Sequence, residues 1–150
     1  MVGGRRSEVG DRRTEDGSQR TEGGLQINSA KELKVYKKAF ALAMQIFDCS
    51  KRWPVEERYS LTDQIRRSSR SVCANLREAW AKRRYEAHFL SKLTDSDAEN
   101  SETDTWLDFA MDCGYISKEE HRAFVKECKE IGAMLGSMIN KLGTFTLKQS

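Results

Sequence analysis

Apolar positions along most of this chain recur with the period of an α-helix, and the segment 60–85 shows the pattern most clearly. One face of this segment is apolar or small at successive steps of three and four residues. A second stripe lies about half a turn away, and its spacings of 7, 4, 7 and 7 residues keep it within a narrow arc. The segment therefore predicts a helix with one buried face and an opposite face that carries a row of guanidinium groups. The first face comprises Leu61, Ile65, Ser68, Ser69, Val72, Leu76 and Ala79, and the second comprises Tyr59, Arg66, Arg70, Arg77 and Arg84.

The preceding segment predicts another helix, which begins near Ser29 and ends before Pro54. Ser29 and Glu32 have the spacing of a capping box. Pro54 is the only proline, and the residue before a proline avoids helical angles. Ser60 is then the expected N-cap of the arginine-bearing helix. The apolar stripe of the first helix comprises Val35, Tyr36, Ala39, Phe40, Leu42, Ala43, Ile46 and Phe47, and Trp53 is expected to cover the end of the core.

Two more helices follow a break that we expect near residues 82–85, because one uninterrupted rod would leave its apolar face uncovered. The third helix runs to about Cys113, and Gly114 suits the position after its C-cap. Ser117 and Glu120 form a second capping box, and Gly143 ends the fourth helix. The inner positions of the third helix are Tyr85, Phe89, Leu93, Ser96, Asn100, Thr103, Trp106 or Leu107, and Ala110. Those of the fourth are Phe124, Cys128, Ile131, Leu135, Met138 and Leu142.

Four such helices with short connections and no strand signal predict an all-α, antiparallel up-down four-helix bundle over residues 29–143. Residues 144–150 are expected to form a C-terminal tail. Residues 1–28 hold six of the ten glycines and few large apolar side chains, so we expect a disordered N-terminal tail. The tail could be a basic arm for nucleic acid or a solvated segment, and its five arginines balanced by five acids favour the second.

Charge is distributed unevenly although the net charge is only +3. Residues 58–84 carry +6, whereas residues 86–112 carry −7. The arginine stripe could bind nucleic-acid phosphates, pair with the acidic segment within a subunit or across an interface, or form a solvated face. The preference for Arg over Lys weighs against the third interpretation. The candidate nucleic-acid ligands are Arg66, Arg67, Arg70, Arg77, Lys82, Arg83 and Arg84.

Motifs for catalysis and metal binding are missing from the sequence. His88 and His121 lack the glutamate three residues earlier that a di-metal bundle requires. No phosphate loop, zinc spacing or nucleophile motif occurs. The four cysteines are expected to be packed thiols rather than disulfides. Cys73 lies beside arginines that could lower its pKa, but no histidine base is near in sequence, which favours a structural cysteine. The sequence thus predicts a protein that is not an enzyme and needs no cofactor or metal. With no apolar run long enough to span a membrane and no secretory signal, a cytoplasmic location is expected.

Three segments resemble one bacterial family: residues 33–47, the run QIRRSSRSVCANLREA at 64–79, and ETDTWLDFAMDCGYIS at 102–117. The family comprises proteins encoded in intervening sequences of large-subunit ribosomal RNA genes, together with the accessory variability proteins of diversity-generating retroelements. The resemblance implies an antiparallel four-helix bundle that assembles as a homopentameric barrel. For the retroelement members it also implies binding to a reverse transcriptase and contact with its RNA or DNA.

Two functions follow as hypotheses. The first is a non-enzymatic accessory protein that binds RNA, and in a retroelement a reverse transcriptase, through the basic face of the second helix. The alternative is a homo-oligomeric protein-interaction scaffold without direct nucleic-acid binding.

Overall fold

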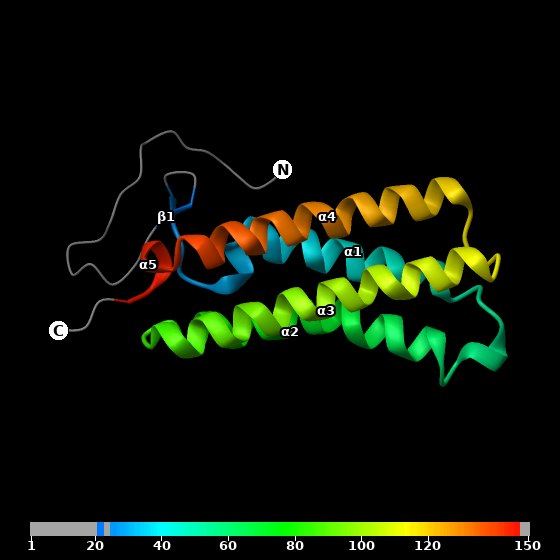
Figure 1. Ribbon diagram of the computed structural model, residues 1–150, viewed down its shortest axis with the longest axis horizontal. Coiled ribbons are helices and arrows are strands. Elements are labelled where there is room, and N and C mark those ends of the chain that lie inside the picture. Colours follow the sequence, from blue (N-terminus) through cyan, green and yellow to red (C-terminus); the bar gives the residue numbers. More distant parts are fainter. Residues whose placement is uncertain (1–20, 23–24, 148–150) are drawn as a thin grey trace.

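The computed structural model describes residues 21–22 and 25–147. Four long helices run side by side, and successive helices point in opposite directions (Figure 1). A two-residue antiparallel ladder precedes them, and single turns of 3-10 helix lead into the first two long helices. The elements are β1 (Thr21–Glu22), β2 (Leu25–Gln26), η1 (Ala30–Glu32), α1 (Lys34–Ser50), η2 (Val55–Glu57), α2 (Leu61–Ala81), α3 (Glu86–Asp112), α4 (Lys118–Asn140) and α5 (Leu142–Phe145).

The four long helices form a closed ring of neighbours. α2 packs against α1 and α3, and α4 packs against α3 and α1, so α2 and α4 lie on opposite sides of the bundle. The predicted helical bundle is therefore confirmed, apart from the short β1–β2 ladder. The predicted inner faces are buried as well: every position of the apolar face of α2 is buried, as are Phe89 and Leu93 on α3 and Ile131 and Leu135 on α4. Two predicted positions are exposed instead: Tyr85, which lies outside α3, is 56% exposed, and Phe40 of α1 is 52% exposed.

Polar side chains in the middle of α3 are buried because each has a partner on a neighbouring helix. Thr103 Oγ1 lies 2.8 Å from Ser68 Oγ on α2. Ser96 Oγ donates to the Val72 carbonyl of α2 at 2.9 Å, and Asn100 Nδ2 donates to the Cys128 carbonyl of α4 at 2.9 Å. These bonds satisfy groups whose burial would otherwise be costly.

The turn between α2 and α3, the end of α3 and the start of α4 agree with the sequence. A turn at residues 82–85 separates α2 from α3, as predicted. At the far end of α3, Gly114 has φ +78°, and Tyr115 N–H donates to the Ala110 carbonyl at 2.9 Å, which is the Schellman arrangement. Ser117 and Glu120 form the predicted capping box of α4.

Two predicted helix limits and one predicted capping bond are wrong. Ser29 caps η1 rather than α1, because Leu33 is extended and α1 starts only at Lys34. Ser60 directly precedes α2 as predicted, but its side chain makes no capping bond, since its backbone (φ −127°, ψ −108°) is not extended; Glu57 Oε1 accepts the Leu61 N–H at 3.2 Å. α4 ends at Asn140, and Gly143 lies inside the short helix α5.

Both ends of the bundle extend past the predicted domain limits. Ile27 was placed in the N-terminal tail, but it is only 3% exposed and packs in the core. Phe145, placed in the C-terminal tail, packs with its ring 6.3 Å from that of Trp80. The remaining disorder prediction concerns mainly residues 1–20 and 23–24, which lie outside the described residues.

Candidate nucleic-acid interface

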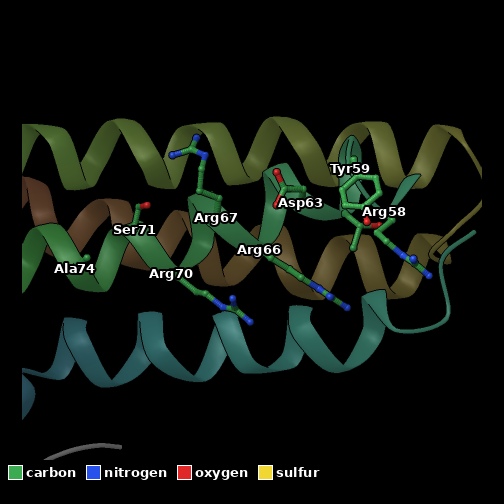
Figure 2. Close-up of a pocket in the computed structure, with 9 residues that line it drawn as sticks. Arg58, Tyr59, Asp63, Arg66, Arg67, Arg70, Ser71 and Ala74 are labelled. Atoms are coloured by element: carbon green, nitrogen blue, oxygen red, sulfur yellow. The ribbon is translucent and has the colours of Figure 1, made fainter. Parts of the chain in front are cut away.

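The outward side of the N-terminal half of α2 is an open groove of about 580 Å³. α1 and α3 flank it, and side chains from the turn before α2 close one end (Figure 2). Four of the nine lining residues are arginines, and Asp63 is the single acid among them. Ser71 and Ala74, both small, continue the groove along α2. The full lining is Arg58, Tyr59, Thr62, Asp63, Arg66, Arg67, Arg70, Ser71 and Ala74.

The wall beside α1 is formed by two arginines stacked on one aromatic ring. The guanidinium carbon of Arg66 lies 4.7 Å from the centre of the Phe47 ring, and that of Arg70 lies 5.4 Å from it. Arg66 Nε also donates to Ser50 Oγ at 2.8 Å, and its Nη2 donates to the Phe47 carbonyl at 3.4 Å. These contacts hold Arg66 in place while using only part of its five N–H donors. The sequence predicted that the stripe would point directly away from the core, whereas both side chains lean toward α1.

The wall beside α3 is partly neutralised. Arg67 is directed toward α3 (Figure 2), where it pairs with Glu102 and lies 3.5 Å from Glu99. Trp106 Nε1 donates to the same Glu102 carboxylate at 3.3 Å. The predicted pairing between the basic and acidic segments therefore occurs within one subunit at this wall. No acid in the described chain forms an ion pair with Arg58, Arg66 or Arg70.

The closed end of the groove is set by Glu57. Its Oε1 accepts the Leu61 N–H at 3.2 Å, and its Oε2 accepts the Tyr115 hydroxyl at 2.8 Å. The hydroxyl of Tyr115 is the main reason why the pKa of Glu57 is lowered, and the same bond raises the pKa of Tyr115 to about 12. The next two residues, Arg58 and Tyr59, extend from this anchored turn into the groove. Tyr59 is 86% exposed.

The other predicted ligands lie elsewhere. Arg77, Lys82 and Arg84 are exposed but do not line the groove. Arg83 is buried: its guanidinium lies 4.0 Å from the centre of the Trp80 ring, and Nη1 donates to the Trp80 carbonyl at 2.8 Å. Burial lowers the pKa of Arg83. It cannot present its charge as the sequence predicted, because the turn after α2 rotates it inward.

Arg58 is the lining arginine that the sequence analysis left out of its candidate ligands. It precedes α2, so helical periodicity does not relate it to the stripe. The one feature of the sequence that could have identified Arg58 is its place at the start of the basic segment 58–84. Tyr59 was recognised as part of the stripe but not as a candidate ligand.

Elsewhere in the described residues, few side chains have the properties of a reactive or metal-binding group. Burial raises the pKa of Cys73 and of Cys128 to about 12, so both thiols remain protonated at neutral pH. Across residues 21–22 and 25–147, no group of three His, Cys, Asp or Glu side chains could hold a metal ion. No helix of the described part combines the length and apolar composition that crossing a bilayer requires.

Fold and groove together define a small helical bundle with a basic, open surface on one helix. Comparison with protein families identifies it further: the chain belongs to the 23S rRNA-intervening sequence protein family, whose model matches residues 31–137. It is also similar to a solved structure of a protein of unknown function from the S23 ribosomal protein family of Bacteroides thetaiotaomicron. The two share 31% identity over 71% of this chain and 95% of that chain, with a TM-score of 0.65. Comparison with curated proteins gives no match.

Proposed function

We propose that this protein is a non-enzymatic accessory protein that binds RNA through the groove on α2. The observation that carries the proposal is the convergence of Arg58, Arg66, Arg67 and Arg70 on one open surface with a single acid. The name of the family, which refers to 23S ribosomal RNA, supports an RNA context.

Phosphate is the group that this surface suits best. Arginine offers a planar fork of donors that matches two phosphate oxygens, and it keeps its charge at any physiological pH. Phe47 and Ser50 already fix the position of Arg66, so less side-chain entropy is lost when a phosphate binds. A guanidinium stacked on an aromatic ring also keeps its outer edge available for hydrogen bonds.

The test compares two variants with the same change in charge. In the groove variant, Arg66, Arg67 and Arg70 are all changed to Gln. In the control, Arg122, Lys126 and Lys129 of α4, which lie across the bundle, are changed to Gln. Affinity for a labelled RNA oligonucleotide is measured by fluorescence anisotropy between about 50 and about 200 mM salt.

The groove variant should lose binding, and circular dichroism should show unchanged helicity. In single substitutions, each lost phosphate contact should flatten the slope of log affinity against log salt by about 0.7–0.9. The α4 control should bind nearly as the wild type does. Wild-type affinity in the groove variant, or an equal loss in both variants, would contradict binding in the groove.

We further propose that the protein acts as a cytoplasmic homo-oligomer, a pentamer by its resemblance to the family, and that a reverse transcriptase is its partner in a retroelement setting. Phe40 and Met44, one helical turn apart on α1, are 52% and 46% exposed and offer apolar surface for such contacts. The same two residues favour the alternative function of a protein-interaction scaffold.

Sedimentation that shows only a 17.2 kDa species at micromolar concentration would contradict self-assembly. Failure of the protein to copurify with a co-expressed reverse transcriptase would contradict that partnership.

A further inference from the structure

Tyr59 differs from the other aromatic side chains around the bundle. At 86% it is the most exposed of the large hydrophobic residues in the described chain. Most aromatic rings in that part have a ring partner, as Trp53 has in Tyr115 and Trp80 in Phe145. No ring contact or hydrogen bond within the described residues involves Tyr59, although it lines the arginine groove.

The position of the Tyr59 ring is nevertheless constrained by its neighbours in sequence. Glu57 joins the turn to the Leu61 N–H and to the Tyr115 hydroxyl, and Ser60 N–H donates to the Glu57 carbonyl at 3.0 Å. Leu61 itself is buried at the start of α2. Tyr59 therefore belongs to a turn that hydrogen bonds hold in place, and its ring is exposed to solvent directly before Arg66, Arg67 and Arg70.

We infer that the groove takes single-stranded nucleic acid, with Tyr59 stacking on one unpaired base while Arg66 and Arg70 hold the adjacent phosphates. This inference rests on the proposed RNA-binding function. An aromatic ring beside a basic groove is the arrangement that binds single strands, since every base offers a face for stacking. In a duplex the base faces are already stacked on one another, so Tyr59 could reach only the backbone.

The layout of the groove agrees with one strand rather than two. Arg66 and Arg70 lean toward α1 and Arg67 leans toward α3, so the charges line the two sides of α2 instead of forming a ridge (Figure 2). Beyond these arginines along α2 lie Ser71 and Ala74, whose short side chains leave room for a backbone (Figure 2). The anionic surface of α3 next to Arg67, at Glu99 and Glu102, would repel the second strand of a wide duplex.

The experiment measures affinity for a single-stranded RNA, for the same RNA in a duplex, and for a strand of equal length with abasic sites. Wild type should prefer the single strand. Tyr59→Ala should weaken that binding by about 5-fold to about 150-fold, while affinity for the duplex and for the abasic strand changes less than about 2-fold. Tyr59→Phe should bind as the wild type does, because stacking needs the ring and not the hydroxyl. Tyr85→Ala, at another exposed tyrosine outside the groove, is the matched control.

Two failures can be told apart. If the groove variant with Gln at 66, 67 and 70 binds RNA as the wild type does, the proposed function itself is wrong. If that variant loses binding but wild type binds duplex and single strand equally, or Tyr59→Ala leaves single-strand affinity unchanged, only the inference about the single strand is overturned.

Discussion

Arginines lie over an aromatic ring in the first half of α2 and again just after its end, yet the outcomes are opposite. Arg66 lies over Phe47 at the edge of an open groove, whereas Arg83 lies over Trp80 in the interior. The difference is in what covers the other side of the guanidinium. Near Trp80 the C-terminal segment folds back, with Phe145 against the indole and Leu147 N–H donating to the Arg83 carbonyl at 3.2 Å. Among residues 21–22 and 25–147 no such segment covers Phe47, so the same contact pre-orients a charge there instead of burying it.

The largest expected effect tests the core that both ends share. Leu135 is fully buried on α4, so Leu135→Ala should lower the free energy of unfolding by about 2–5 kcal/mol by opening a cavity. Urea unfolding would be followed by tryptophan fluorescence and by circular dichroism in variants that keep only Trp53, before α2, or only Trp80, at its end. Within each variant, coincident midpoints of the two probes are expected for a cooperative bundle. Separate midpoints would show that the two ends unfold independently, and a change below about 0.5 kcal/mol would contradict the packing of Leu135.

Arg83→Ala should come next in size. It removes a buried side chain that packs on Trp80 and bonds to its carbonyl, so unfolding should become easier by about 1–3 kcal/mol. RNA affinity should change less than about 2-fold, since Arg83 is far along α2 from the groove. Arg77→Ala, at an exposed position, serves as the control and should stay within about 0.5 kcal/mol. A loss of RNA binding with unchanged stability would reverse the roles assigned to the two ends.

Arg66→Ala should show the opposite pattern. Stability should change by less than about 1 kcal/mol, because Ser50 Oγ keeps its own bond to the Phe47 carbonyl at 3.1 Å. RNA affinity should fall about 10-fold or more, as expected for a charge-assisted contact. Arg66→Lys should recover only part of this affinity, because an ammonium group keeps the charge but not the fork. Full recovery by Lys would indicate that only charge matters at this position.

The smallest effect concerns pH and the turn that presents Tyr59. The pKa of Glu57 is lowered in the folded state, so its contribution to stability is present above its unfolded pKa and is lost as pH falls through the folded value. The pKa of Tyr115 is raised to about 12, so its contribution holds below the unfolded value near 10 and is lost as pH rises through about 12. Glu57→Gln should therefore destabilise slightly at neutral pH and not at all in acid. Urea midpoints of the two proteins across this range would test it, and a difference independent of pH would contradict the Glu57–Tyr115 coupling.

Much of the fold could be predicted because burial in a bundle is periodic. The steps of three and four that marked Ile65, Val72 and Leu76 are a direct record of which face of α2 meets its neighbours. The candidate site was harder to predict from the sequence. Periodicity orients a residue only within its own helix, so it could not locate Arg58 before α2 or Arg83 after it. Nor could it show that Phe47 of α1 would draw Arg66 to one side, since that depends on how two helices pack.

Local capping signals depended on the backbone of the residue before each helix. Ser117 is extended and caps α4 as its spacing with Glu120 indicates. Ser60 has the expected identity and position, but its φ of −127° and ψ of −108° lie outside the extended region that an N-cap normally adopts. That backbone depends on the path of the preceding turn, which the sequence does not encode in a simple spacing.

The buried bond between Ser68 and Thr103 has a consequence at the surface. The residues preceding these two in sequence are Arg67 and Glu102, which pair at the rim of the groove. Sliding α3 along α2 by one turn would break the Ser68–Thr103 bond and leave these two hydroxyls only the Ile65 and Glu99 carbonyls of their own helices. It would also leave the Ser96 hydroxyl without the Val72 carbonyl, at a cost of about 1–3 kcal/mol for that unsatisfied group. The buried hydrogen bonds between α2 and α3 thus fix the register of the side chains on the surface of the two helices. This register determines which acid faces which arginine, and hence which arginines keep their charge unpaired.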